Sequence, residues 1–175
     1  MPLFGGTNRP RLDGLTKDEE KRRDALNPEV LRRAGEKGVA GQAPAAMAVL
    51  REKMEQEPND FLWPCLLGWQ YASMGRFVPA IHAFDEAVKR DANDVRAYYG
   101  AGRSYFEAAE TKLKLGPTAP PEATFEEMTV DNMYHEAGRY FRRALELVED
   151  KKERDQVRTF LSSVEKAVAK KAGRL

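Results

Sequence analysis

The sequence predicts an all-α protein that is built from consecutive antiparallel helix pairs. Between residues 61 and 94, apolar residues recur at spacings of three and four on two segments that meet at Gly75, and this spacing marks one face of an α-helix. Small residues such as Gly68 alternate with large ones such as Phe84, which lets two antiparallel helices approach closely. A similar pattern returns after 34 residues, in 95–109. The helix pair is therefore expected to repeat along the chain.

The composition of the chain restricts its class. Its 175 residues suit one domain, and its 29 basic and 28 acidic residues leave a net charge of +1, so we expect no general attraction to nucleic acid. No apolar run approaches the ~18 residues that a membrane span requires, and the first residues lack the layout of a signal peptide. The one cysteine excludes an internal disulfide and a cysteine-based metal cluster, and a cytoplasmic location is expected.

Residues 1–26 are expected to form an N-terminal arm. Residues 1–15 are rich in glycine and proline and contain few residues that could build a core. Thr16 and Glu19 have the spacing of a capping box, which predicts a short charged helix over 17–26.

The first helix pair is expected in residues 27–60, in a degenerate form. Carrying the 34-residue register backwards places Leu50 at the position of Phe84 and predicts a helix over 44–56. Residues 28–41 contain three glycines, each of which costs on the order of 1 kcal/mol in a helix interior, so a short or frayed helix is expected there.

The second pair, residues 61–94, carries the clearest signals. Asp60 is a suitable cap for its first helix, and Gly75 is suited to form the turn between the two helices. Pro64 and Pro79 fall within the first turn of their helices, where the missing N–H has no intrahelical partner to lose.

The third pair, residues 95–150, is interrupted by an insertion at about 110–131. Its first helix is expected to continue to about Leu115 and to stop at Gly116, followed by an acidic loop. Thr129 is then the expected cap of the second helix.

Residues 151–175 are expected to form a C-terminal capping helix and a basic tail. Apolar residues between Val157 and Val168 share one face of a helix over 152–171, and its other face is polar. Such a helix covers the open apolar end of a helical stack.

The pattern of the second pair matches a known repeat family. The matching positions are Leu67, Gly68, Tyr71, Gly75, Phe77, Ala80, Phe84 and Ala87. On these residues the chain resembles the tetratricopeptide repeat proteins, with Ala92 standing where the family usually has proline. The resemblance implies a right-handed α-solenoid of about three helix pairs plus the capping helix. It also implies a non-enzymatic protein whose concave groove binds a peptide or a partner protein.

In that family the first helix of each repeat lines the groove, so the resemblance assigns a binding surface. The groove positions are Leu62, Cys65, Trp69, Ala72, Ser73, Arg96, Tyr99, Arg103, Phe106 and Glu107, of which Leu62, Trp69, Ser73, Arg96, Tyr99, Arg103 and Phe106 are the predicted peptide-binding residues. Arginines beside aromatic rings suit acidic or aromatic peptide segments. The alternative is that Trp69 and Phe106 pack against the N-terminal arm or the inserted loop.

One subtype of the family is argued against by particular residues. Members that clamp a terminal carboxylate use a lysine and asparagines at positions that correspond here to Cys65, Trp69 and Gly100. None of these side chains supplies the required charge or amide.

Residues with catalytic chemistry are sparse. The two histidines, His82 and His135, have no metal-ligating residue at a suitable spacing, and Cys65 has no histidine nearby in the sequence. We therefore expect no catalytic residues, no metal site and no cofactor.

The leading functional hypothesis is a non-enzymatic adaptor, scaffold or assembly factor that binds a protein or peptide. The first alternative is a structural or self-associating subunit of a larger complex, in which the groove is filled by the protein's own arm or by a second copy. A second alternative is a small-molecule or nucleic-acid binder that uses Arg96, Tyr99 and Arg103.

Overall fold

The computed structural model describes residues 12, 14–35, 38–171 and 173, and among these it contains helices and no β-strand. The expected all-α class is therefore confirmed. The helices are α1 (Lys17–Asp24), α2 (Asn27–Ala34), α3 (Gly38–Gln56), α4 (Leu62–Ser73), α5 (Phe77–Arg90), α6 (Val95–Leu115), the 3-10 turn η3 (Gly116–Thr118), α7 (Val130–Leu147) and α8 (Lys151–Lys171). None of the helices in the described ranges has the length and apolar character needed to cross a membrane.

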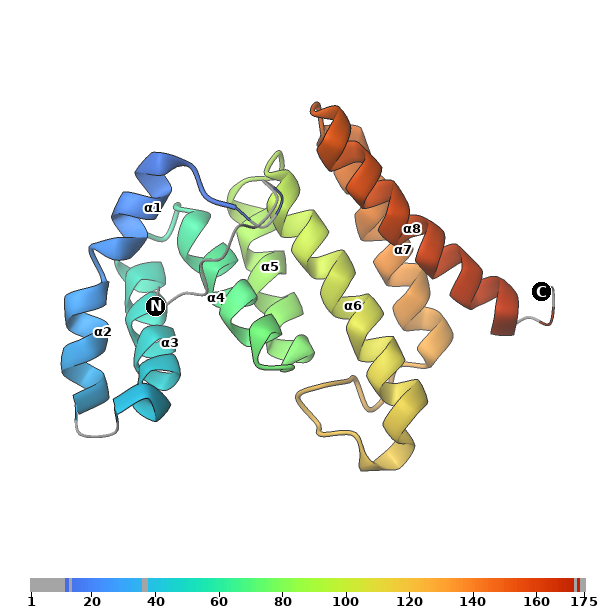
Figure 1. Cartoon of the computed structure of the whole chain (residues 1–175), viewed down its shortest axis with the longest axis horizontal. Helices are drawn as coiled ribbons and strands as arrows, with labels where there is room; N and C mark the ends of the chain where they lie inside the picture. Colours follow the sequence, from blue (N-terminus) through green and yellow to red (C-terminus); the bar gives the residue numbers. More distant parts are fainter. Residues whose placement is uncertain (1–11, 13, 36–37, 172, 174–175) are drawn as a thin grey trace.

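The helices follow one another in space in the order of the chain. Figure 1 shows a row that begins with α1–α3 and ends with α7 and α8. From α2 onward each helix packs against the next, α4 also contacts α6, and α6 contacts α8. Thus α4, α6 and α8 are neighbours in one layer, and this layer carries the candidate site.

Glycines set the distance between the helices of a pair. A Cβ atom added to Gly68 on α4 would lie 2.7 Å from Phe84 Cε1 on α5, and one added to Gly102 on α6 would lie 3.0 Å from the ring of Phe141 on α7. The two glycines lie on the first helices of neighbouring pairs and are 34 residues apart, as the sequence pattern predicts. The rings of Phe84 and Phe141 are fully buried, so each occupies the space that the missing side chain leaves.

The first part of the chain differs from the expected boundaries. α1 begins after Thr16 with the predicted capping box, in which Thr16 and Glu19 bond each other's backbone N–H groups. However, α3 begins at Gly38 rather than at Pro44, which lies inside the helix. Pro44 removes one backbone donor from the helix, yet the helix continues through it, with Gly41, Ala45 and Ala46 buried on either side. Packing therefore extends this helix beyond the limit that the glycines and the proline suggest.

The insertion in the third pair is folded onto the helices around it. Gly116 ends α6 with a φ of 54°, and the Thr129 side chain accepts a hydrogen bond from the Asn132 N–H, as expected for stop and cap. The Phe125 ring stacks on Tyr105 of α6 at a centroid distance of 5.7 Å. The side chain of Lys112 donates hydrogen bonds of 2.7 to 2.9 Å to three backbone carbonyls between 125 and 128. The insertion is therefore part of the packed structure.

The final helix covers the end of the row. Val157 and Val164 of α8 are buried, and Phe160 stacks on Phe141 at 5.7 Å. Tyr99 of α6 meets Phe160 edge to face at the same distance. The last helix thus closes the apolar layer between α6 and α7.

Candidate functional site

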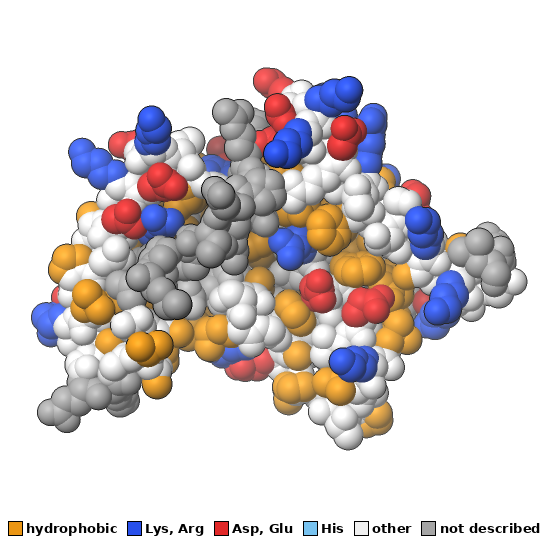
Figure 2. Space-filling model, viewed as in Figure 1, with side chains coloured by type: hydrophobic (Ala, Val, Ile, Leu, Met, Phe, Trp, Pro, Cys, Tyr) orange, Lys and Arg blue, Asp and Glu red, His pale blue; other side chains and the backbone are white. Residues whose placement is uncertain are grey.

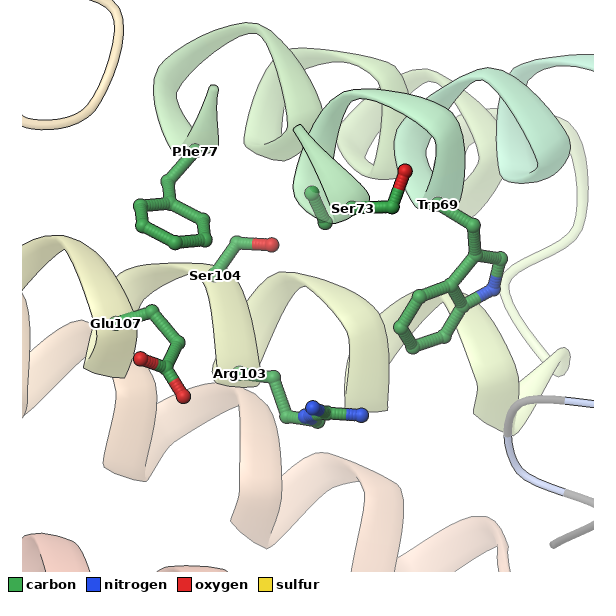
Figure 3. Close-up of a pocket in the computed structure, with 7 residues that line it drawn as sticks. Trp69, Ser73, Phe77, Arg103, Ser104 and Glu107 are labelled. Atoms are coloured by element: carbon green, nitrogen blue, oxygen red, sulfur yellow. The ribbon is translucent and has the colours of Figure 1, made fainter. Parts of the chain in front are cut away.

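A pocket of about 340 Å³ lies between α4 and α6. Its lining residues are Trp69, Ala72 and Ser73 from α4, Phe77 from α5, and Arg103, Ser104 and Glu107 from α6. Figure 3 shows the α4 side chains facing those of α6 across the open space, with Phe77 at one end. On the face seen in Figure 2, hydrophobic side chains gather around α6 towards α8, with charged side chains among them.

Helical spacing explains why these residues meet. Trp69 and Ser73 are four residues apart on α4, and Arg103 and Glu107 are four apart on α6, so each pair shares one face of its helix. Because α5 runs back between them, α4 and α6 run in the same direction and present corresponding positions side by side. The site is thus made by two first helices of neighbouring pairs.

The guanidinium of Arg103 lies among aromatic rings from three helices. Its central carbon is 5.3 to 5.9 Å from the ring centroids of Trp69 on α4, Tyr99 on α6 and Phe160 on α8. Such distances allow cation–π attraction, and a planar guanidinium held by rings is pre-oriented for charge-assisted hydrogen bonds. The positive charge on this margin of the pocket is therefore held in a defined position.

The other polar groups of the pocket give it a second charge and two hydroxyls. Glu107 stands one turn beyond Arg103, so a negative charge follows the positive one along α6. The hydroxyls of Ser73 and Ser104 donate to the carbonyls of Gln70 and Gly100 of their own helices, at 2.8 and 2.9 Å. Their oxygens still have the capacity to accept a hydrogen bond.

The structure brings together three of the seven predicted peptide-binding residues. Trp69, Ser73 and Arg103 line the pocket, as do Ala72 and Glu107 from the wider set of groove positions. Trp69 is only half-buried, although its ring meets Phe84 edge to face at 4.9 Å.

The other four predicted residues lie elsewhere. Leu62 and Tyr99 are fully buried, and the Tyr99 hydroxyl accepts a hydrogen bond of 2.8 Å from Gln156 on α8. Phe106 packs against Tyr134 of α7, with ring centroids 5.9 Å apart. Within the described part of the chain, the aromatic ring that contacts Phe106 thus belongs to a helix, whereas the alternative interpretation placed Phe106 against the inserted loop.

Arg96 is held by an ionic cluster at the start of α6. Its guanidinium donates to both carboxylate oxygens of Glu19, at 2.7 and 2.9 Å, and to Asp94. The carbonyl of Gly14 accepts a further hydrogen bond of 3.3 Å. Burial raises the pKa of Glu19, but the hydrogen bonds from Arg96 and from the Thr16 N–H outweigh this effect, so the pKa lies below its usual value.

Part of the N-terminal arm is therefore packed against the helices. Leu12 is fully buried in the core cluster, and Leu15 packs against that cluster. The interpretation that the arm fills the groove concerns mainly residues 1–11, which lie outside the described residues.

Two pocket residues are missing from the sequence prediction. Phe77 shares the packing face of α5, so the sequence pattern assigned it to the core, but it stands directly after the turn and also lines the pocket. Ser104 is next to a predicted groove residue. To predict that it lines the pocket, one must know how α4 and α6 are rotated relative to each other, and the sequence does not contain this information.

Reactive groups do not gather at the pocket. No group of three or more His, Cys, Asp or Glu residues in the described part of the chain is arranged to hold a metal ion. Cys65 is buried, and burial raises the pKa of its thiol to about 12, so the thiol stays protonated at neutral pH. The described pocket residues offer binding groups: aromatic faces, two charges and two hydroxyls.

Comparison with known proteins found no matching family model and no matching curated protein. The relation to the tetratricopeptide repeat family therefore stays a prediction from the residue pattern.

Proposed function

We propose that this protein is a non-enzymatic scaffold or adaptor of the tetratricopeptide repeat type, whose solenoid of helix pairs binds a segment of a partner protein in the pocket between α4 and α6. The observation that carries the proposal is the convergence of Trp69, Arg103 and Glu107 on one pocket formed by two neighbouring first helices. The proposed location is the cytoplasm, where an unpaired cysteine stays reduced.

The chemistry of the pocket defines the segment. A volume of about 340 Å³ lies within the range of small ligand sites and suits the insertion of one large side chain. Trp69 and Phe77 supply apolar surface for such an anchor. Arg103 and Glu107 favour an acidic group and a basic group on either side of it. The proposed ligand is thus an extended segment with an aromatic or large apolar residue between opposite charges.

Ser73 offers a clean way to block the pocket. It is exposed, and its hydroxyl bonds the Gln70 carbonyl within α4, so a larger side chain there would enter the pocket without displacing the core. Ser73→Trp is therefore the blocking variant, and Ser73→Ala, which leaves the pocket open, is the matched control.

The test uses a phage-displayed library of random dodecapeptides, selected on the full-length protein. Synthetic copies of the selected peptides are titrated with the three proteins, and Kd is measured by fluorescence anisotropy. We expect Kd to rise at least about tenfold for Ser73→Trp and to stay within about twofold for Ser73→Ala. Equal affinities for all three proteins, or a failure to select any peptide, would contradict the proposal. Peptide-independent dimers in sedimentation would favour the self-associating alternative.

A further inference from the structure

A second surface lies where α4 and α6 begin, and a segment of the chain itself covers it. We call this segment the N-terminal strap: Leu12 together with residues 14–24, which include α1. Figure 1 shows the dark-blue chain before α1 reaching across to the start of α6. The surface beneath is made by the loop that precedes α4 and the loop that precedes α6.

The acidic contact of the strap is made with the first turn of α6. Glu19 and Arg96 form a two-bond ion pair whose side chains are only 11 % and 13 % exposed. Asp94 holds the other side of the guanidinium, and the Phe61 ring lies 5.2 Å from it. A carboxylate at this point therefore meets a guanidinium that is already fixed in position.

The basic contact of the strap is made with the first loop. Arg22 bonds Glu57 at 3.0 Å and also pairs with Asp60, and its guanidinium lies 4.8 Å above the ring of Trp63. Glu19 and Arg22 are three residues apart, so they lie on the same side of α1. The surface beneath carries the complementary charges in matching order.

Charge rather than apolar packing holds α1 in place. Glu19 is the one buried residue of this helix, and the apolar anchors Leu12 and Leu26 lie outside it. A helix of eight residues is marginal by itself, and of its two ionic contacts the partly exposed pair of Arg22 with Glu57 weakens with salt. The α1 part of the strap is thus a good candidate for reversible release.

We propose that this surface is a second binding site, which takes in trans a short helix with a glutamate in its first turn and an arginine three residues later, and that the strap occupies it in cis. The inference goes beyond the proposed function. Arg96 and Arg103 are two helical turns apart, about 10 Å along α6, so the two sites can be tested separately.

The test exposes the site in the full-length protein. The double variant Glu19→Lys plus Arg22→Glu reverses both charges of the strap and leaves the surface beneath unchanged. The probe is a fluorescein-labelled peptide with the sequence of residues 12–26. We expect its Kd for the double variant to be at least about tenfold lower than for the wild type, and to rise at least about threefold between 50 and 500 mM salt.

Two controls decide whether the peptide uses this surface. Adding Arg96→Ala to the double variant should abolish binding, and a peptide with both charges reversed should fail to bind. Equal affinity with and without Arg96→Ala, or equal affinity of the double variant and the wild type, would overturn the proposal. Binding of library-selected peptides at the 69–107 pocket should be unchanged, so failure of one site would not be mistaken for failure of the other.

A second measurement covers the case in which the double variant does not fold. Amide hydrogen exchange of the wild-type protein should be at least about a hundredfold faster in α1 than in α4 and α6, because the strap opens without global unfolding. Equal protection of all three helices would refute reversible release.

Discussion

The ring of Phe84 lies between glycines of two helices. A Cβ atom on Gly100 would be 2.4 Å from Phe84 Cζ, and one on Gly68 would be 2.7 Å from Cε1. Contacts this short require the ring to move, and Phe84 is fully buried, so the surrounding side chains resist that movement. Glycine is thus needed at both positions because of packing.

Gly100→Ala is therefore expected to lower the free energy of unfolding by about 1–3 kcal/mol, measured by urea titration. Replacing Phe84 with leucine in the same protein should recover part of the loss, because the two substitutions act on one contact. Gly138→Ala is the matched control: its Cβ would meet only the mobile end of Arg142, at 3.3 Å, and alanine favours the helix. A loss as large for Gly138→Ala as for Gly100→Ala would contradict this explanation.

The ion pair of Glu19 predicts a dependence of stability on pH. The pKa of Glu19 is lowered in the folded protein, so its contribution is fully present above the unfolded value of about 4.3 and is lost as the pH falls through the folded value. Glu19→Gln should lower the free energy of unfolding by about 1–3 kcal/mol at pH 7. The charged groups that face Glu19 are Arg96 and, across it, Asp94.

The measurement is urea unfolding between pH 7 and pH 2.5. The stabilities of wild type and Glu19→Gln should converge towards the acid end, whereas the exposed control Glu20→Gln should follow the wild type throughout. A difference that stays constant with pH would show that the charge of Glu19 does not cause the effect.

At the scale of single elements, one side chain of α6 holds the last part of the insertion. Lys112 donates hydrogen bonds to the backbone carbonyls of Phe125, Glu126 and Met128. These carbonyls lie in an irregular segment, so they have no helical hydrogen-bond pattern to join. Lys112→Met keeps the aliphatic stem and removes all three donors. It should speed cleavage by a glutamate-specific protease after the exposed Glu126 and Glu127 by at least about threefold, because local opening becomes easier.

Lys114→Met is the control for this experiment, because Lys114 is exposed two residues further along the same helix. It removes the same charge and should leave the cleavage rate unchanged. Equal acceleration by both substitutions would indicate a general charge effect on the protease rather than a hold on the loop.

Helix ends that are set by local capping or stop signals could be predicted from the sequence. The start of α3 and the folding of the insertion depend on contacts between distant segments and could not. The Thr16 capping box, the stop at Gly116 and the cap at Thr129 rest on contacts within a few residues, and all are present. The start of α3 at Gly38 depends on packing against α2 and α4, which outweighs the local preference of glycine and proline. The folded insertion depends on contacts between residues distant in sequence, such as the hydrogen bonds of Lys112 and the ion pair of Arg76 with Glu122.

At the scale of the whole molecule, the order of charges along α6 predicts which partner segments bind. Glu107→Lys should lower the affinity for peptides that carry a basic residue beside the anchor at least about tenfold. It should raise the affinity for versions with an acidic residue there. Anisotropy titrations of both peptides with both proteins measure this reversal. Glu165→Lys on α8 is the control, because its charge lies outside the pocket. Loss of both peptides to the same degree would contradict a charge contact at Glu107.

The candidate site could be predicted only in part, for a physical reason. The resemblance to the tetratricopeptide repeat proteins implied that the first helices of the pairs line a groove, and three of the residues that it assigned there, Trp69, Ser73 and Arg103, line the pocket. It could not indicate that Tyr99 is covered by α8 or that Arg96 is bound by Glu19, because both depend on segments outside the repeats. Departures from the repeat therefore decide which of its positions stay open.

Quenching of tryptophan fluorescence tests the binding site most directly. The chain has two tryptophans; Trp63 is only 2 % exposed, whereas Trp69 is half-buried at the pocket, so acrylamide reports mainly on Trp69. Saturation with a library-selected peptide should lower the quenching constant by about half or more, because the peptide excludes solvent from the pocket. An unchanged quenching constant under saturating peptide would contradict binding between α4 and α6.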